Sequence, residues 1–165
     1  MYTISPKSRP MPRIVLVNPE IPPNTGNIAR TCAATGTELH LVEPLGFELS
    51  DKYLKRAGLD YWQYVPLTCH KSFEDFAHHS QELGGRWIGF STRGRLSYTQ
   101  IEYREDDWLI YGKETSGLSP EVCDQCTNLV RIPMGETGVR SLNLSVSVAI
   151  GLFESRRQLG YLNQP

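Results

Sequence analysis

The chain has 165 residues, of which 39% are hydrophobic and 21% charged, with a net charge of -1 and a pI near 6.4. This length suits one domain, and the near-zero charge argues against a protein that coats nucleic acid through charge alone. No apolar run approaches the roughly 18 residues that cross a bilayer. Residues 1–12 lack the apolar core of a secretory signal and predict a flexible extension before a domain at 13–165. Together with four cysteines, this favours a reducing, cytoplasmic location.

Short apolar runs that end in turn residues predict six strands, most of them parallel. In chain order these strands are 13–18, 38–42, one within 61–67, 86–90, 107–111 and 128–132. Helices are expected between and after them, over 24–36, 51–57, 72–79, from Ser119 onward and after Asn143. The alternation predicts an α/β domain with a mainly parallel sheet and helices on both faces.

Three polar loops, 24–30, 112–117 and 135–143, follow predicted strands. Ligands bind at the carboxyl edge of open parallel sheets, so these loops are the candidate site. The sequence has neither the Gly-x-Gly-x-x-Gly of a dinucleotide fold after its first strand nor the Gly-x-Ser-x-Gly of a hydrolase. Gly112-Lys113 fails the P-loop pattern because Asp107 and Glu114 replace its first glycine and its hydroxyl residue.

Each polar residue of these loops also has a purely structural interpretation. Asn24 can cap the first helix, Glu114 can brace its loop, and Ser141 and Asn143 can cap the last helix.

The last helix, over 144–154, is apolar around roughly 240° of its circumference, whereas a helix on one sheet face needs a single stripe. Two-sided burial is therefore expected. Either a second subunit covers the outer side, which predicts a homodimer, or this is the central core helix of a monomer.

Cys123 and Cys126 have the spacing of a zinc-ligand pair or a redox couple. Structural zinc needs two more ligands, and the other candidate pair, Cys69 and His70, lies far away in the sequence. No metal site is predicted.

Residues 24–30, 111–117 and 131–145 resemble the three successive motifs of the SpoU branch of the SPOUT methyltransferases. The resemblance is closest to the small bacterial tRNA wobble-nucleotide (cytidine or uridine) 2′-O-methyltransferases, and it extends over 13–161. Lys113 departs from the pattern, since some relatives have proline there.

The resemblance implies a C-terminal deep trefoil knot, an exception to the rule against threaded chains, and an obligate homodimer. It also implies S-adenosyl-L-methionine as cofactor, S-adenosyl-L-homocysteine as product and a tRNA anticodon stem-loop as partner, with neither DNA nor a membrane involved. The catalytic residues implied are Arg30, Asn24, Glu114 and Asn143, and the cofactor-binding residues are Phe90, Gly112, Ile132 and Ser141. Basic residues that can contact RNA phosphates, or belong to a solvated surface, are Lys52, Lys55, Arg56 and Arg93.

The implied reaction is attack of a ribose 2′-hydroxyl on the sulfonium methyl group. A guanidinium stays protonated, so we expect Arg30 to clamp the phosphate beside the target ribose rather than act as a base, with Asn24 and Glu114 orienting it. One alternative is methylation of another tRNA or rRNA nucleotide, and a second is a non-catalytic knotted RNA-binding protein.

Overall fold

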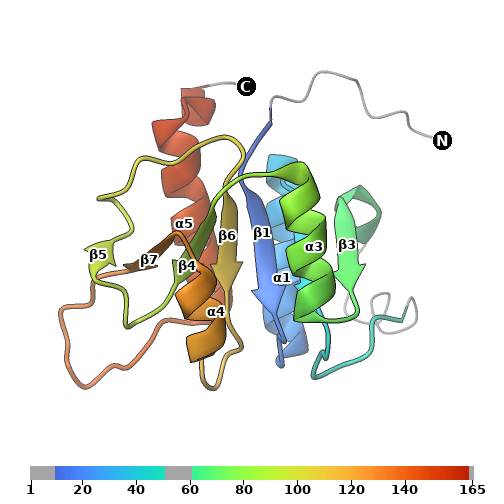
Figure 1. Cartoon of the computed structure of the whole chain (residues 1–165), viewed down its shortest axis with the longest axis horizontal. Coiled ribbons are helices and arrows are strands. Elements are labelled where there is room, and N and C mark those ends of the chain that lie inside the picture. Colours follow the sequence, from blue (N-terminus) through green and yellow to red (C-terminus); the bar gives the residue numbers. More distant parts are fainter. Residues whose placement is uncertain (1–9, 51–60, 164–165) are drawn as a thin grey trace.

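The computed structural model describes residues 10–50 and 61–163, which form one parallel sheet with helices on both faces (Figure 1). The strand order is β3-β2-β1-β6-β4-β7-β5, and every neighbouring pair is parallel. The strands are β1 (Arg13–Val17), β2 (Leu39–Val42), β3 (Leu67–His70), β4 (Trp87–Phe90), β5 (Leu96–Ser97), β6 (Trp108–Tyr111) and β7 (Asn128–Arg131). The predicted fold class is confirmed.

Helices α1 (Pro22–Thr35) and α5 (Leu144–Gln158) pack together on one face, and α3 (Phe73–Leu83) and α4 (Pro120–Gln125) lie on the other (Figure 1). Two short 3-10 helices, η1 (Trp62–Tyr64) and η2 (Tyr161–Asn163), complete the described elements. Among the described helices, none combines the length and the hydrophobicity that a transmembrane span requires.

Strand β1 explains why the sheet is covered on both sides. Its alternate side chains enter two separate cores, with Ile14 and Leu16 facing α1 and α5, and Val15 and Val17 facing α3 and α4. Each buried aliphatic side chain contributes about 1.5–3 kcal/mol relative to exposure. The unbroken apolar run of this strand therefore corresponds to burial on both faces.

Two details of the predicted sheet are wrong. The sheet has seven strands instead of six, because the two residues of β5 pair with β7 and are too short to show a periodic pattern. The third strand lies at Leu67–His70, while the preceding aromatic segment forms η1. Pro66 between them has no N–H to donate, although its carbonyl accepts from Leu39 at 2.9 Å.

The last helix keeps part of its apolar surface exposed. Val148 and Leu152 are completely buried in the core that α5 shares with α1 and the sheet. Val146 and Phe153 are instead 46% and 44% exposed. Apolar side chains thus occupy two sides of the helix, and residues 10–50 and 61–163 cover only one of them.

The described chain ends also contact each other. The Tyr161 hydroxyl donates to the Pro10 carbonyl at 2.8 Å, and Arg156 of α5 contacts Met11. The trefoil knot stays a prediction. The predicted helix at 51–57 and its basic residues Lys52, Lys55 and Arg56 lie outside the described residues.

Candidate functional site

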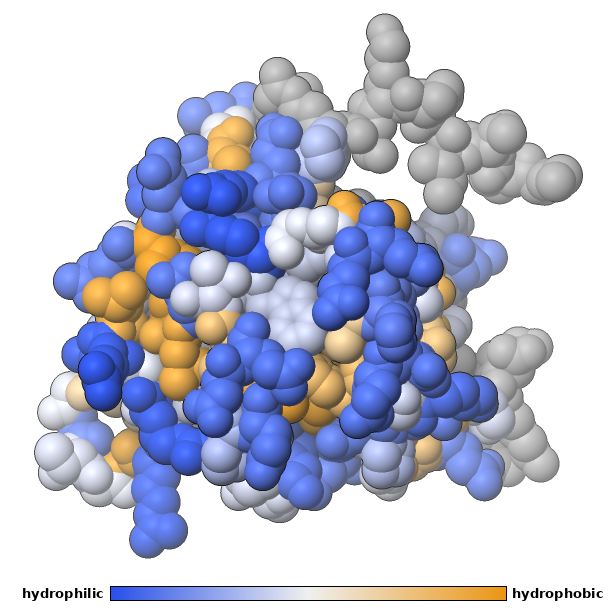
Figure 2. Space-filling view, viewed as in Figure 1, coloured by the Kyte–Doolittle hydropathy of each residue, from blue (hydrophilic) through white to orange (hydrophobic). Residues whose placement is uncertain are grey.

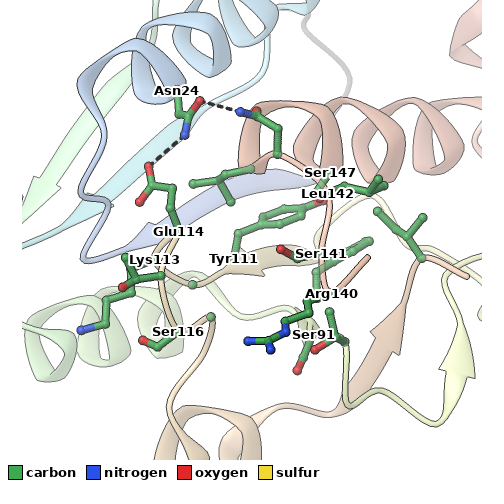
Figure 3. A pocket seen from close by; sticks show the side chains of 18 of the residues that line it. Asn24, Ser91, Tyr111, Lys113, Glu114, Ser116, Arg140, Ser141, Leu142 and Ser147 are labelled. Carbon is green, nitrogen blue, oxygen red and sulfur yellow. Dashed lines mark hydrogen bonds between the residues drawn. The ribbon is translucent and has the colours of Figure 1, made fainter. Parts of the chain in front are cut away.

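Four loops at the carboxyl ends of β1, β4, β6 and β7 enclose a pocket of about 460 Å³ (Figure 3). This is the edge at which parallel sheets bind ligands. The pocket brings together all the predicted catalytic and cofactor-binding residues except Arg30. Those present are Asn24, Phe90, Gly112, Glu114, Ile132, Ser141 and Asn143.

Glu114 holds the start of α1. Its carboxylate accepts hydrogen bonds from the backbone N–H groups of Glu20 at 2.8 Å and Ile21 at 3.0 Å. The helix then begins with Pro22 and Pro23, which carry no N–H, so few donors of its first turn need partners. A carboxylate here also interacts favourably with the positive end of the helix dipole. The predicted brace role of Glu114 therefore extends beyond its own loop to a distant helix.

Asn24 connects this carboxylate to the last helix. Its side-chain amide donates to Glu114 at 3.3 Å, and its carbonyl oxygen accepts from the Asn143 amide at 3.0 Å (Figure 3). Asn143 in turn accepts from the backbone N–H and the hydroxyl of Ser145, at 2.9 and 2.6 Å, and so caps α5. One hydrogen-bonded chain, the Glu114–Asn24–Asn143 chain, thus joins three loops of the pocket.

These hydrogen bonds test the predicted helix-cap roles of Asn24 and Asn143. The predicted cap role of Asn143 is confirmed. The cap role of Asn24 is wrong, because α1 starts two residues earlier and Asn24 is a buried bridge inside its first turn.

A second pair of contacting residues, Glu20 and Thr115, was not predicted from the sequence. The Glu20 carboxylate accepts from the Thr115 backbone N–H at 3.2 Å and from its hydroxyl at 2.8 Å. Because the Glu20 N–H donates to Glu114, the β1 and β6 loops hold each other reciprocally. The available signal was an acidic residue three positions after a buried strand, inside a proline-rich loop.

An aromatic pair lies below the pocket. The rings of Phe90 and Tyr111, at the ends of β4 and β6, stack with their centroids 4.5 Å apart. Gly151 of α5 faces them, and a Cβ atom there would overlap the Tyr111 hydroxyl and approach the Phe90 ring to 2.7 Å. The Tyr111 hydroxyl is buried without a hydrogen-bond partner in the described structure, and burial raises its pKa well above 10.

Close backbone packing shapes the β6 loop. A Cβ atom on Gly112 would overlap the backbone of Gly117 and Leu118, so this position requires glycine. The Gly117 N–H donates to the Lys113 carbonyl at 2.8 Å and closes the loop.

The basic residues divide into two groups. Arg93, Lys113 and Arg140 line the pocket, and Arg93 also donates to the Leu118 carbonyl at 3.0 Å. Arg30 does not line it; its guanidinium carbon lies 5.5 Å from the centroid of the Tyr61 ring. The expected orientation of Arg30 by Asn24 and Glu114 is not observed within the described chain. Arg140 was not among the predicted site residues, because a single basic residue in an irregular loop carries no periodic signal that shows which way it points.

The cysteine pair lacks the features of a redox couple. The Cys126 thiol donates to the Val122 carbonyl at 3.3 Å, and burial raises its pKa to about 12, which disfavours the reactive thiolate. Across residues 10–50 and 61–163, no three histidine, cysteine or acidic side chains are grouped so as to hold a metal ion.

The parallel sheet and the pocket at its carboxyl edge define a ligand-binding α/β protein of the open-sheet class. Residues 11–153 match the model of the SpoU rRNA Methylase family, and the chain belongs to this family.

Three relatives illustrate the match. A Synechocystis protein with the provisional name tRNA (cytidine(34)-2′-O)-methyltransferase is 60% identical over 149 residues, which cover 90% of this chain and 97% of that protein. A solved structure described as giving structural insights into the 2-OH methylation of C/U34 on tRNA is 47% identical, with a TM-score of 0.86 and coverage of 93% and 99%. An AdoMet-bound rRNA methyltransferase from Sinorhizobium meliloti is 28% identical, with a TM-score of 0.81 over 92% of this chain and 58% of that one.

Proposed function

We propose that this protein transfers a methyl group from S-adenosylmethionine to the ribose 2′-hydroxyl of the wobble nucleotide, a cytidine or uridine, in the anticodon loop of tRNA. The observation that carries the proposal is the Glu114–Asn24–Asn143 chain, which links the three motif loops around one pocket. The names of the relatives, which share 47–60% identity and nearly full length, supply the substrate. A tRNA substrate supports the predicted cytoplasmic location.

The pocket suits the cofactor. Gly112, Ile132 and Ser141 line it, and the stacked pair of Phe90 and Tyr111 gives it an apolar floor. We assign the backbone groups of these three residues to cofactor binding. Backbone donors and acceptors with an apolar surface are what a flat adenine ring and its ribose require. When bound, S-adenosylmethionine supplies an electrophilic methyl group on a positively charged sulfur.

The contribution of the protein to the reaction is mainly positioning. Charge separation falls during methyl transfer, so in-line alignment of the hydroxyl with the methyl group matters more than charge stabilisation. Both oxygens of Glu114 already accept hydrogen bonds from the β1 loop and Asn24. We therefore assign Glu114 and Asn24 to holding the loops, and Asn143 to fixing the loop that meets both substrates.

We further propose a homodimer through the exposed apolar side of α5. The outer surface of α3 is hydrophilic (Figure 2), whereas α5 exposes Val146 and Phe153. Apolar groups that a chain leaves uncovered beside its ligand pocket favour an isologous interface. In such a dimer, Arg30 can serve a site shared between subunits, where it would contact RNA phosphate. Other proposed phosphate contacts are Lys52, Lys55, Arg56 and Arg93.

The test is incubation of the protein with labelled S-adenosylmethionine and total tRNA, followed by mapping of the methylated nucleotide. Label on the 2′-oxygen of nucleotide 34 is expected. Label elsewhere in tRNA, or only in added rRNA, would support the alternative target. Absence of transfer despite calorimetric cofactor binding would instead support the non-catalytic RNA-binding alternative.

A further inference from the structure

Arg140 belongs to the loop between β7 and α5, and its side chain extends into the pocket (Figure 3). Within the described residues its guanidinium makes no hydrogen bond or ion pair. Other arginines of this chain are held: Arg86 by the buried Asp107 at 2.8 Å, and Arg157 by Glu154 at 2.9 Å. A guanidinium has up to five N–H donors to satisfy, so one left open inside a pocket is available to a ligand.

The loop also keeps its own acidic residue away from Arg140. The Glu136 carboxylate accepts from the backbone N–H of Gly138 at 2.9 Å, inside a local turn. No acidic side chain within this loop is therefore paired with the guanidinium.

The pocket lining carries an excess of positive charge. Its cationic residues are Arg93, Lys113 and Arg140, whereas Glu114 is the one acid among the described residues that line it. The Glu114 oxygens are already occupied by two backbone N–H groups and the Asn24 amide. The pocket is thus organised to receive negative charge.

This charge is unexpected for the cofactor alone. The sulfonium and ammonium groups of S-adenosylmethionine are cationic, and its carboxylate is its one anionic group, so a free guanidinium nearby disfavours binding unless it meets an oxyanion. Arginine presents a planar fork that matches both carboxylate and phosphate oxygens.

We infer that Arg140 is the oxyanion-binding residue of the pocket, and that its ligand is either the cofactor carboxylate or a phosphodiester next to the target ribose. The choice between these two sources rests on the proposed function. Within one chain, Arg140 and not Arg30 has the position needed to hold such a group.

The experiment compares Arg140→Gln and Arg140→Lys with the wild type and with Arg104→Gln as a matched control. Arg104 is exposed and lies just before β6, at the opposite edge of the sheet. Calorimetry gives the Kd of S-adenosylmethionine and of 5′-methylthioadenosine, which lacks the amino-acid carboxylate. Filter binding gives the Kd of tRNA as a function of salt concentration.

If the ligand is the cofactor carboxylate, Arg140→Gln should weaken S-adenosylmethionine binding about 10- to 100-fold, the range for a charge-assisted hydrogen bond, and leave methylthioadenosine unchanged. If it is a phosphodiester, cofactor binding should be unchanged while the salt slope of tRNA binding falls by about one. Arg140→Lys should retain part of either interaction. Equal weakening of both small ligands, or no difference from Arg104→Gln, would overturn the inference.

Failure of the Arg140 inference can be distinguished from failure of the proposed methyl transfer. These arms measure binding, so they remain informative if the wild type transfers no methyl group to tRNA. In that case a selective effect of Arg140→Gln on S-adenosylmethionine would keep the inference while the proposed function fails.

Discussion

Replacement of Glu114 by glutamine tests whether this residue positions the site or acts on the reacting atoms. The isosteric amide keeps one acceptor oxygen but places an NH₂ group opposite a backbone N–H donor. At least one charge-assisted hydrogen bond is lost, worth about 1.5–3 kcal/mol, and one half-buried donor is left unmet, at about 1–3 kcal/mol. Allowing for partial solvent access, we expect the free energy of unfolding to fall by about 2–4 kcal/mol.

The assay is urea denaturation at fixed protein concentration, because a dimer makes apparent stability concentration-dependent. For a chain of this length the loss corresponds to roughly 5–12 °C in Tm. Glu121→Gln in the exposed first turn of α4 is the control and should change little. A Glu114→Gln protein of wild-type stability whose single-turnover rate, at saturating cofactor, has fallen about 100-fold or more would refute the positioning role.

Three further changes test the core, the histidines and the outer side of α5. Gly151→Ala should cost about 1–3 kcal/mol by overpacking against Tyr111 and weaken cofactor binding, and adding Tyr111→Phe should recover part of both in denaturation and calorimetry. Burial beside two other histidines lowers the pKa of His70 to about 4. The unfolded chain therefore binds a proton that the folded chain does not, and stability should fall by at most about 3 kcal/mol as pH drops from 6.5 to 4. His70→Gln should flatten this dependence in denaturation curves. Phe153→Ser should shift the sedimentation coefficient toward that of a monomer.

Matched controls exist for two of these changes. His78 is exposed on α3, next to His79 in the sequence, so His78→Gln should keep the wild-type pH dependence. An identical flattening would exclude His70 as its source. Leu83 is 53% exposed at the end of α3, and Leu83→Ser should leave the sedimentation coefficient unchanged. A Phe153→Ser protein that sediments like the wild type would count against the α5 interface.

The sheet was predictable because burial on both faces leaves unbroken apolar runs, as in β1. The pocket was predictable because polar loops follow strands that end at one edge. Strand β5 was not predictable, because a strand of two residues is too short to show an alternating pattern.

The first residue of α1 could not be predicted from the neighbouring sequence, because Glu114, which accepts hydrogen bonds just before the helix, is more than ninety positions away. The different directions of Asn24 and Arg30 could have been predicted from helix geometry. Six residues along a helix correspond to a rotation of roughly 240°, so Asn24 and Arg30 cannot point into the same pocket even though they share one motif.

The Glu114–Asn24–Asn143 chain has a consequence for biosynthesis. Its members come from the beginning, the later middle and the end of the sequence, and 119 positions separate Asn24 from Asn143. Contacts of such long range form late in folding, after local elements have closed. A nascent chain that has not yet delivered its last helix would leave the Asn24 carbonyl oxygen unpaired and one wall of the pocket missing. The binding site therefore forms only after Asn143 and α5 have been synthesised, and we expect fragments that end before Asn143 to bind neither substrate.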